Sequence, residues 1–388
     1  MKLYCFVNGI FSTNIGGGDT YFANVINGVS EDLIVIGGHA TKYYLEDQGV
    51  KVNNIILTDK SIMAPSNSQL KLLWDFTKRF LRTIPQLKEI QPTDVAYAMS
   101  DYWFDVIPLI LCKAEKKILY LGMMAPSLKE IILKSRPDIT QGRVAALYYW
   151  ASQNFSLKLF KLFCSPFNSY VTYSHPTMRY YLKKKFSFLD FQLYYIPNGC
   201  NIELANSISN IPSEAKFYDV VWIGRVHPQK GINDLTRMLN ELSFSIPNFK
   251  ALIIGNDGVK LKNSVSTDHV HFTGRISETK KFTCLKNSRV FAMSSHYESW
   301  GIVVGEALVC GTPVVAYDLD CFKTIFNADT TNNIDFIPCF NTNNWIHTIK
   351  QKVLNLRKGL QINYTNTTLN LPTWNESKQK LKELITYG

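Results

Sequence analysis

The chain has 388 residues, and its 42 Lys and Arg against 31 Asp and Glu give a net charge of +11. This length suggests two domains, each large enough for its own core, and the 46% hydrophobic and 19% charged content excludes a disordered chain. The 8 Cys form no CxxC pair, which indicates free thiols in a reducing cytosol and not disulfides or a zinc site. We expect no signal peptide in the start MKLYCFVNGI, and no membrane span, because no apolar run of about 18 residues occurs.

Strand and helix patterns alternate from residue 1 to about residue 196, which is typical of an open parallel sheet. Gly16, Gly17 and Gly18 lie between the first strand and a helical pattern over 19–29. Glycines at such a place let a backbone approach a phosphate at a helix start, although a tight strand-to-helix turn is their commoner role. The strands predicted in this half are Lys2–Val7, Leu33–Ile36, Val95–Met99, Lys117–Leu121, Tyr170–Tyr173 and Leu193–Ile196.

The positive charge is concentrated in the first half, since residues 60–190 hold 19 Lys and Arg against 9 Asp and Glu. Within this region, residues 150–167 interleave aromatic and aliphatic side chains with lysines, a pattern that favours docking on an anionic membrane surface. The alternative is a core helix with a solvated basic face. No nucleic-acid partner is expected, because no recognition motif accompanies the charge. The basic residues of this cluster are Lys78, Arg79, Lys158, Lys161 and Lys183–Lys185.

The second half begins after a polar stretch over 200–215, which is predicted to be a linker. A second series of alternating strands and helices then runs from Tyr218 to about residue 369. Within it, the Asn- and Thr-rich segment Asp329–Asn344 is predicted to be a surface loop, and Trp374–Thr386 is predicted to be a charged amphipathic helix. The strands predicted here are Val220–Ile223, Ala251–Ile254, His269–Phe272, Val290–Met293 and Val314–Tyr317.

Two cations follow the first strand of this second series. The segment 219–224 has the pattern of a buried strand, Arg225 and Lys230 lie in the loop that follows, and a helix begins near Ile232. Open α/β sheets bind ligands at the carboxyl ends of their strands. Fixed cations there suit a diphosphate and offset the charge that develops when it leaves. The alternative is two surface cations beside a turn.

Two carboxylates eight positions apart, Glu298 and Glu306, flank a glycine that opens a helical pattern. The backbone N–H groups of Gly301, Ile302 and Val303 are expected to be unpaired at this helix start, where they attract phosphate. A carboxylate offers two acceptor oxygens to sugar hydroxyls. The spacing therefore predicts a ligand with an anionic middle and hydroxyls at both ends, such as a nucleoside-diphosphate sugar. The alternative is a capped surface helix with two solvated acids.

These motifs resemble glycosyltransferase family 4, a family of retaining sugar transferases that is also described as glycosyl transferases group 1. The likeness covers most of residues 218–318 and is weaker before them. It rests on Gly224-Arg225 with Lys230-Gly231, the E-x7-E frame of Glu298 and Glu306, and Gly311-Thr312-Pro313-Val314-Val315. The resemblance implies an α/β protein of the GT-B fold, with two Rossmann-like domains facing each other across a deep cleft. An acceptor domain would span 1–196 and a donor domain 197–369, with a C-terminal helix over 370–388 packing back on the first domain.

The resemblance also implies roles for single residues. Arg225, Lys230 and the helix start would hold the diphosphate, Glu306 the ribose, and Glu298 the transferred sugar, so that Arg225, Lys230 and Glu298 carry catalysis. Gly17 and Gly18 match a glycine pair that reaches the donor in the family. No Asp-rich metal motif occurs, and we expect neither a metal nor another cofactor. The residues expected to bind the donor are Gly17, Gly18, Arg225, Lys230, Gly274, Arg275, Ile276, Glu298, Trp300, Gly301, Ile302, Val303 and Glu306.

One residue of the family pattern is missing. The family often places a histidine after the strand that Lys117–Leu121 forms here, where it contacts the donor sugar, but this segment holds no histidine. Tyr120 or a backbone carbonyl near Gly122 is a candidate substitute. His39, after the second strand, and His175, after the fifth, are more typical of structural histidines.

The function that the resemblance implies is transfer of a sugar, with retained configuration, from a nucleoside-diphosphate sugar to a hydroxyl of a glycan or lipid-linked acceptor. This activity would serve polysaccharide, lipopolysaccharide or glycolipid synthesis at the cytoplasmic face of the membrane. A leaving-group oxygen can take the acceptor proton, so catalysis needs orientation and charge stabilisation but no protein nucleophile. Two alternatives stay open: a nucleotide-sugar 2-epimerase of the same fold, and a catalytically silent GT-B subunit.

Overall fold

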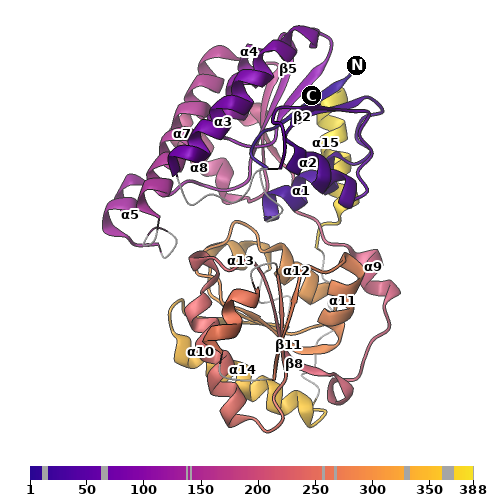
Figure 1. The fold of residues 1–388 in the computed structure, drawn as a ribbon, viewed down its shortest axis with the longest axis vertical. Helices are drawn as coiled ribbons and strands as arrows, with labels where there is room; N and C mark the ends of the chain where they lie inside the picture. The colour runs from indigo at the N-terminus through magenta and orange to yellow at the C-terminus, as the bar shows by residue number, and fades with distance from the viewer. Residues whose placement is uncertain are drawn as a thin grey trace. The chain divides into compact units, whose positions relative to one another are not determined.

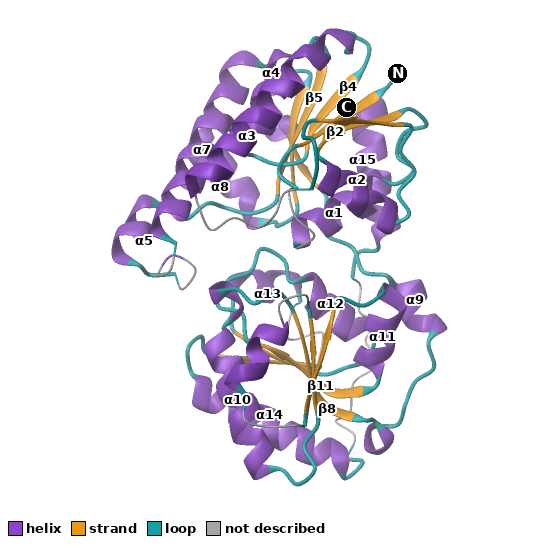
Figure 2. Ribbon diagram, viewed as in Figure 1, coloured by secondary structure: helices purple, strands orange, loops and turns teal. Residues whose placement is uncertain are grey.

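A computed structural model describes residues 1–10, 16–62, 69–136, 139, 142–255, 258–265, 269–326, 333–360 and 371–387. The chain divides into two compact units (Figure 1). The first comprises residues 1–134, 142–199 and 374–388, and the second comprises residues 135–141 and 200–373. Each unit is built on one open sheet whose described strand pairs are all parallel, with helices on its faces (Figure 2). The predicted α/β fold with two Rossmann-like domains is confirmed.

The sheet of the first unit has the strand order β3-β2-β1-β4-β5-β6-β7. Tyr4 and Phe6 of β1 join a core cluster with α4, α7 and α8, while α1 and the C-terminal helix α15 pack together on the other side (Figure 1). The strands are β1 Leu3–Val7, β2 Leu33–Gly37, β3 Asn54–Leu57, β4 Val95–Ala98, β5 Lys116–Leu121, β6 Ser169–Tyr173 and β7 Leu193–Tyr195. The helices are α1 Gly17–Ile26, α2 His39–Asp47, α3 Gln69–Thr83, α4 Trp103–Leu111, α5 Leu128–Leu133, α7 Arg143–Phe163, α8 Thr177–Phe186 and α15 Trp374–Tyr387.

The sheet of the second unit has the strand order β10-β9-β8-β11-β12-β13. Side chains alternate between its faces: Val220 and Trp222 of β8 pack with α10 and α14, whereas Val221 packs with α11 and α12. Because both faces are covered, the strand is apolar on both faces from Val220 to Ile223. The strands are β8 Tyr218–Ile223, β9 Ala251–Ile254, β10 Val270–Gly274, β11 Ser288–Met293, β12 Val314–Tyr317 and β13 Ile334–Ile337. The helices are α9 Ile202–Ser207, α10 Ile232–Ser245, α11 Glu278–Lys286, α12 Ile302–Val309, α13 Asp320–Ile325 and α14 Thr342–Arg357.

The two ends of the second unit's main segment lie side by side. Cys200 and Thr373 form an isolated parallel bridge, and the Cys200 N–H donates to the carbonyl of Pro372 over 2.8 Å. The main segment of this unit therefore begins and ends at neighbouring residues.

The order of strands reverses at one place in each sheet, where β1 lies between β2 and β4 and where β8 lies between β9 and β11. Open α/β sheets form their ligand crevice at the carboxyl ends of the strands at such a reversal. In the second unit, the segments that leave β8 and β11 carry Arg225, Lys230 and Glu298. Because β8 and β11 are neighbours in the sheet, Arg225 and Lys230 lie at the same edge as Glu298, which is far from them in the sequence.

Two sequence predictions fail at short elements. The segment Asp329–Asn344, expected to be a surface loop, contains the edge strand β13 and the start of α14 among its described residues. Its four strand residues, Ile334–Ile337, are too few for a clear pattern between Asn- and Thr-rich flanks. The stretch over 200–215, expected to be a linker, contains α9, whose start is capped by the Asn201 side chain accepting from the Leu204 N–H over 3.1 Å.

Candidate active site

The loop after β8 is held by a glycine. Gly231 follows a single turn over Pro228–Lys230 and has a φ of +61°. A Cβ added to Gly231 would lie 1.9 Å from the backbone oxygen of Ser294, the residue that follows β11. The Ser294 hydroxyl donates to the Lys230 carbonyl over 2.7 Å and accepts from the Trp222 indole N–H over 3.1 Å. The two loops at the strand-order reversal are therefore packed against each other without space for a side chain.

Lys230 and Glu298 form an ion pair across these loops, in which the Lys230 ammonium donates to a Glu298 carboxylate oxygen. Both side chains are largely buried, with 19% and 9% of their surface exposed. Further hydrogen bonds join the loops: Gln229 Nε2 donates to the Tyr297 carbonyl over 2.7 Å, and the His296 N–H donates to the Gln229 carbonyl over 2.9 Å. A cation and a carboxylate 68 positions apart are thus brought together at the predicted ligand edge.

A polar cluster supports the loop after β11 from α10, β12 and α14. Asp234 Oδ2 lies 2.7 Å from His296 Nε2 and accepts from the Tyr317 hydroxyl over 2.7 Å, and Thr342 donates to Asp234 Oδ1 over 3.0 Å. Burial alone would raise the pKa of Asp234, but these hydrogen bonds hold it below its ordinary value. Sequence reasoning missed this cluster, because its four members lie on separate elements at unrelated spacings.

Helix α12 begins immediately after Gly301, which has a φ of +80°. A Cβ at this position would lie 2.5 Å from a ring carbon of Phe322, so glycine is needed both for the backbone angle and for space. The Val304 N–H donates to the Gly301 carbonyl over 2.9 Å as the helix starts. Among the described residues, no hydrogen bond reaches the backbone N–H groups of Gly301, Ile302 and Val303. This helix start can therefore accept an anion.

Glu306 is buried one turn further along α12, with 2% of its surface exposed. One carboxylate oxygen, Oε1, accepts from Lys281 Nζ of α11 over 2.6 Å. The other, Oε2, is buried and has no hydrogen-bond partner among the described residues. Burial raises the pKa of Glu306, and the charge of Lys281 opposes this shift. The sequence offers no signal for Lys281, because nothing in the spacing of α11 marks it as the partner of Glu306.

Residues 206–353 match the family described as Glycosyl transferases group 1. Over this range the chain is similar to group 1 glycosyltransferases, and residues 206–353 are called the group 1 domain below. Phosphatidyl-myo-inositol mannosyltransferase from Mycobacterium leprae is 32% identical over 139 residues, which are 34% of this chain and 36% of that protein. The protein of the same name from Mycobacterium tuberculosis H37Rv is 26% identical over 210 residues, 52% of this chain and 54% of that protein. These matches span about half or less of the relatives' length.

Solved structures share the fold over the whole chain. Anabaena HepE in complex with UDP and glucose has a TM-score of 0.68 and 16% identity, with 100% of both chains covered. WaaG, a glycosyltransferase involved in lipopolysaccharide biosynthesis, has a TM-score of 0.69 and 13% identity, again with 100% of both chains covered. At this identity the likeness shows the fold alone, and the fold is that of GT-B proteins.

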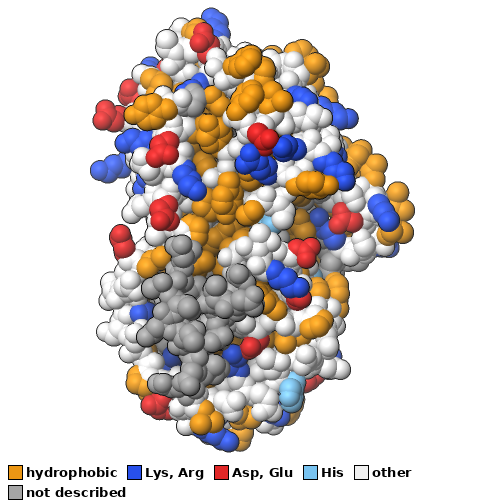
Figure 3. All heavy atoms as spheres, turned by 180° about the vertical axis from the view of Figure 1, so that it is seen from behind, with side chains coloured by type: hydrophobic (Ala, Val, Ile, Leu, Met, Phe, Trp, Pro, Cys, Tyr) orange, Lys and Arg blue, Asp and Glu red, His pale blue; other side chains and the backbone are white. Residues whose placement is uncertain are grey.

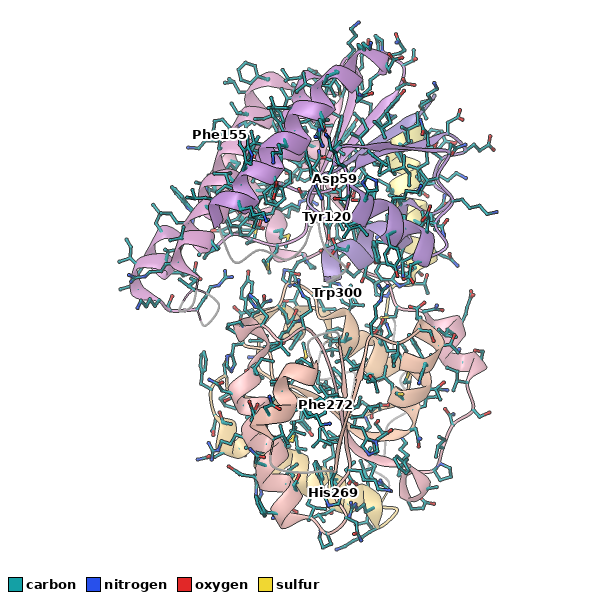
Figure 4. The ribbon with its side chains drawn as sticks, in the orientation of Figure 1. Asp59, Tyr120, Phe155, His269, Phe272 and Trp300 are labelled. Atoms are coloured by element: carbon teal, nitrogen blue, oxygen red, sulfur yellow. The ribbon has the colours of Figure 1, made fainter. Side chains whose placement is uncertain are left out.

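The other predicted donor residues of the group 1 domain differ in how far they are accessible. Arg225 is exposed and has no ion pair among the described residues. Gly274 ends β10 with a φ of +67°, Arg275 after it is exposed, and Ile276 packs on the core. Figure 4 shows Trp300 at the opposite end of this unit from His269, with Phe272 of β10 between them.

Trp300 was expected to contact the donor, but its side chain is 1% exposed. The indole packs edge-on against Phe326 with ring centroids 5.3 Å apart, and a Cβ at Gly305 would meet it at 3.2 Å. The sequence does not show whether the side chain of Trp300, just before Gly301, faces a ligand or the core. In the structure the indole fills space in the core next to α12. Trp300 thus packs against Phe326 and beside Gly305 of α12, and its ring is part of the core of this unit.

Two of the predicted donor residues lie in the first unit, outside the group 1 domain. Gly17 and Gly18 are the exposed first residues of α1. The preceding Gly16 donates its N–H to Asp19 Oδ2 over 2.7 Å, which closes the turn at the helix start. Among the described residues, no group of three or more His, Cys, Asp or Glu is placed to hold a metal ion.

The candidates for the missing histidine have structural partners. His39 Nδ1 lies 2.6 Å from Asp59 Oδ1, and Arg79 Nη2 donates to Asp59 Oδ2 over 2.6 Å (Asp59 is labelled in Figure 4). Arg79 was predicted to belong to the basic surface, but it is 1% exposed and this ion pair buries it. Tyr120 is buried and stacks on Tyr21 with ring centroids 4.3 Å apart.

Proposed function

We propose that the protein is a retaining glycosyltransferase that takes a nucleoside-diphosphate sugar as donor and a hydroxyl group as acceptor. The observation that carries the proposal is the set of groups at the strand-order reversal of the second unit. Lys230 and the N–H groups at the start of α12 suit a diphosphate. Glu298 and the unpartnered oxygen of Glu306 suit hydroxyls on its two sides.

Catalysis follows from charge and orientation. Lys230 and Arg225 offset the negative charge that grows on the leaving diphosphate, so we propose that no metal ion is required. Glu298 already engages Lys230, so its proposed role is to bind sugar hydroxyls and not to attack the anomeric carbon. A leaving phosphate oxygen accepts the acceptor proton while the new bond forms on the same face, which retains the configuration.

The acceptor class is proposed from the relatives. Two of them are phosphatidyl-myo-inositol mannosyltransferases, and WaaG is described as acting in lipopolysaccharide biosynthesis. These names support an acceptor that is lipid-linked or part of a cell-surface polysaccharide. The missing histidine after Lys117–Leu121 favours the silent subunit, but the Lys230–Glu298 pair and the groups at the start of α12 support an intact donor site and favour the transferase over both alternatives.

Nucleoside diphosphates are expected to stabilise the protein against heat. UDP, GDP and ADP are compared as free diphosphates and as sugar conjugates in a thermal-shift assay. A ligand at about 100 times its dissociation constant raises the free energy of unfolding by about 2.7 kcal/mol, which gives a clear shift in Tm. Inorganic phosphate and the nucleosides alone serve as controls and should shift Tm far less. If none of the six nucleotides stabilises the protein, the proposed function is wrong.

We further propose that the first unit binds the inner face of an anionic membrane. Its exposed apolar side chains gather with lysines at the end of α7 and beside α8, and Figure 3 shows hydrophobic and basic side chains interspersed on one face of this unit. Phe167 and Phe191 stack with ring centroids 6.1 Å apart. We call this set the aromatic–lysine surface: Phe155, Lys158, Lys161, Leu162, Phe163, Phe167 and Phe191. None of the helices in the described part of the chain is long and apolar enough to cross a bilayer.

Loss of the exposed rings is expected to weaken membrane binding. The variant Phe163→Ser/Phe167→Ser removes two rings that are 65% and 74% exposed. Each ring contributes about 1.5–3 kcal/mol when fully buried, so partition onto phosphatidylglycerol vesicles should fall at least about tenfold. Vesicle co-sedimentation measures this, with phosphatidylcholine vesicles as a neutral control. Phe244→Ser, at an 84% exposed ring of the second unit, should bind as the unchanged protein does. Equal binding of all three proteins would refute this surface.

A further inference from the structure

The ion pair between Lys281 and Glu306 has no role in the mechanism above. We propose that Lys281 is a positioning residue that keeps Glu306 ionised and occupies its Oε1, so that Oε2 receives the ribose hydroxyls of the donor. The pair would then determine that the site prefers ribonucleotides over 2′-deoxyribonucleotides. This inference rests on the proposed function, because it concerns how the same site binds its nucleotide.

The two carboxylate oxygens of Glu306 have different neighbours. Lys281 enters from α11 and donates to Oε1 over 2.6 Å, while its other acidic neighbour, Glu278, lies 4.0 Å away. Oε2 is buried and has no partner among the described residues. A buried acceptor without a hydrogen bond costs free energy, which a ligand hydroxyl at this place recovers. An ionised carboxylate oxygen is a stronger acceptor than a neutral one, and Lys281 supplies the charge that keeps it so.

The charged groups that face Glu306 support this assignment. Burial raises the pKa of Glu306, and the charge of Lys281 opposes the shift, whereas Glu278 adds to it. Burial also acts to lower the pKa of Lys281, but the two carboxylates outweigh it and raise that pKa. The nearby thiols stay neutral near pH 7, because burial raises the pKa of Cys310 to about 12 and that of Cys200 further. Lys281 is therefore the cation that holds the Glu306 charge.

The experiment compares UDP, GDP and ADP with their 2′-deoxy counterparts by isothermal titration calorimetry. The unchanged protein is expected to bind at least one ribonucleotide about 10- to 100-fold more tightly than its deoxy form, the range for a hydrogen bond to a charged group. Lys281→Met and Glu306→Gln should each reduce this preference to near unity. Lys281→Arg keeps the charge and should keep most of the preference. Lys280→Met, at the exposed neighbour on the same helix, should leave it unchanged.

Measuring the ribose preference at several pH values distinguishes a positioning role of Lys281 from a purely structural one. Without the opposing Lys281 charge, the pKa of Glu306 rises further, so a larger share of the carboxylate is protonated at any given pH in Lys281→Met. The ribose preference of Lys281→Met should therefore increase as the pH is raised, whereas a variant that had lost the fold of the site would not recover it. The double variant Lys281→Met/Glu306→Gln, which buries no lone charge, should fold and show no preference at any pH.

The outcomes distinguish the two proposals. If no nucleoside diphosphate binds the unchanged protein, the proposed function fails and this inference fails with it. If a nucleotide binds but Lys281→Met keeps the ribose preference at pH 7, or loses it without recovery at higher pH, then the role of Lys281 is refuted while the donor site stands.

Discussion

Replacing Lys230 by Met is expected to lower turnover of a nucleoside-diphosphate sugar by about 10²-fold or more, the loss typical of removing one group that stabilises developing charge. Lys230 is the buried cation at the strand-order reversal, and its partner Glu298 lies on the opposing loop. Removing it takes away the proposed contact with the diphosphate and the positive charge that pairs with Glu298. Release of nucleoside diphosphate from UDP-glucose, GDP-mannose and ADP-glucose measures the turnover, with water or an added glycoside as acceptor.

Three further proteins make this result interpretable. Arg225→Met should also lose about 10²-fold, because Arg225 lies on the same loop and has no structural ion pair among the described residues. Lys230→Met leaves the Glu298 carboxylate without its ion-pair partner, and Lys230→Met/Glu298→Gln removes that unpaired charge. The double variant should be as slow as Lys230→Met, which would show that the unpaired carboxylate does not cause the loss of turnover. Arg237→Ala, at an exposed pair with Glu241, should keep normal turnover. Near-normal rates in both Lys230→Met and Arg225→Met would contradict the proposed mechanism.

Replacing Gly231 by Ala is expected to damage both stability and the donor site. The new Cβ would lie 1.9 Å from the Ser294 carbonyl oxygen, and the φ of +61° adds strain for any residue with a side chain. Strain of this kind costs about 1–3 kcal/mol even without a clash, and the clash forces the two loops apart. Urea denaturation should show the loss of stability, and nucleotide titration should show weaker binding, because the separated loops no longer pair Lys230 with Glu298.

Gly311→Ala is the matched control for this prediction. Gly311 also has a positive φ, +68°, but a Cβ there would meet nothing within 4 Å. The substitution should therefore cost only the backbone strain and leave nucleotide affinity unchanged. Equal effects of Gly231→Ala and Gly311→Ala on affinity would show that contact between the loops does not matter for the site.

The sequence predicted the elements that carry long apolar patterns and missed those that depend on tertiary contacts. The strand over Val220–Ile223 and the helix beginning near Ile232 could be placed because their periodicities are clear and a glycine lies between them. The strands β3 and β13 were not predicted, because each is a short edge strand whose apolar pattern is interrupted by polar residues on both sides. Arg79 was also mispredicted from the sequence. An arginine next to a lysine suggests a basic surface, but the Arg79 guanidinium is buried in an ion pair with Asp59.

The sequence motifs select the residues of the candidate site but do not show which of them form ion pairs with each other. Lys230, Glu298 and Glu306 were identified from motif spacing, but spacing cannot show which cation meets which acid. The structure pairs Lys230 with Glu298 and assigns Lys281 to Glu306. Trp300 was misjudged for the same reason, since one sequence position cannot reveal which side of the following helix has room for an indole.

The bridge between Cys200 and Thr373 has a consequence for how such a protein can be rebuilt. Because residues 200–373 begin and end at paired backbone positions, this segment, which is the second unit without residues 135–141, can be exchanged between relatives with both of its junctions at one place. Under the proposed function, grafting a relative's residues between these two points is expected to change the donor that is used, while the sheet and the C-terminal helix of the first unit stay the same.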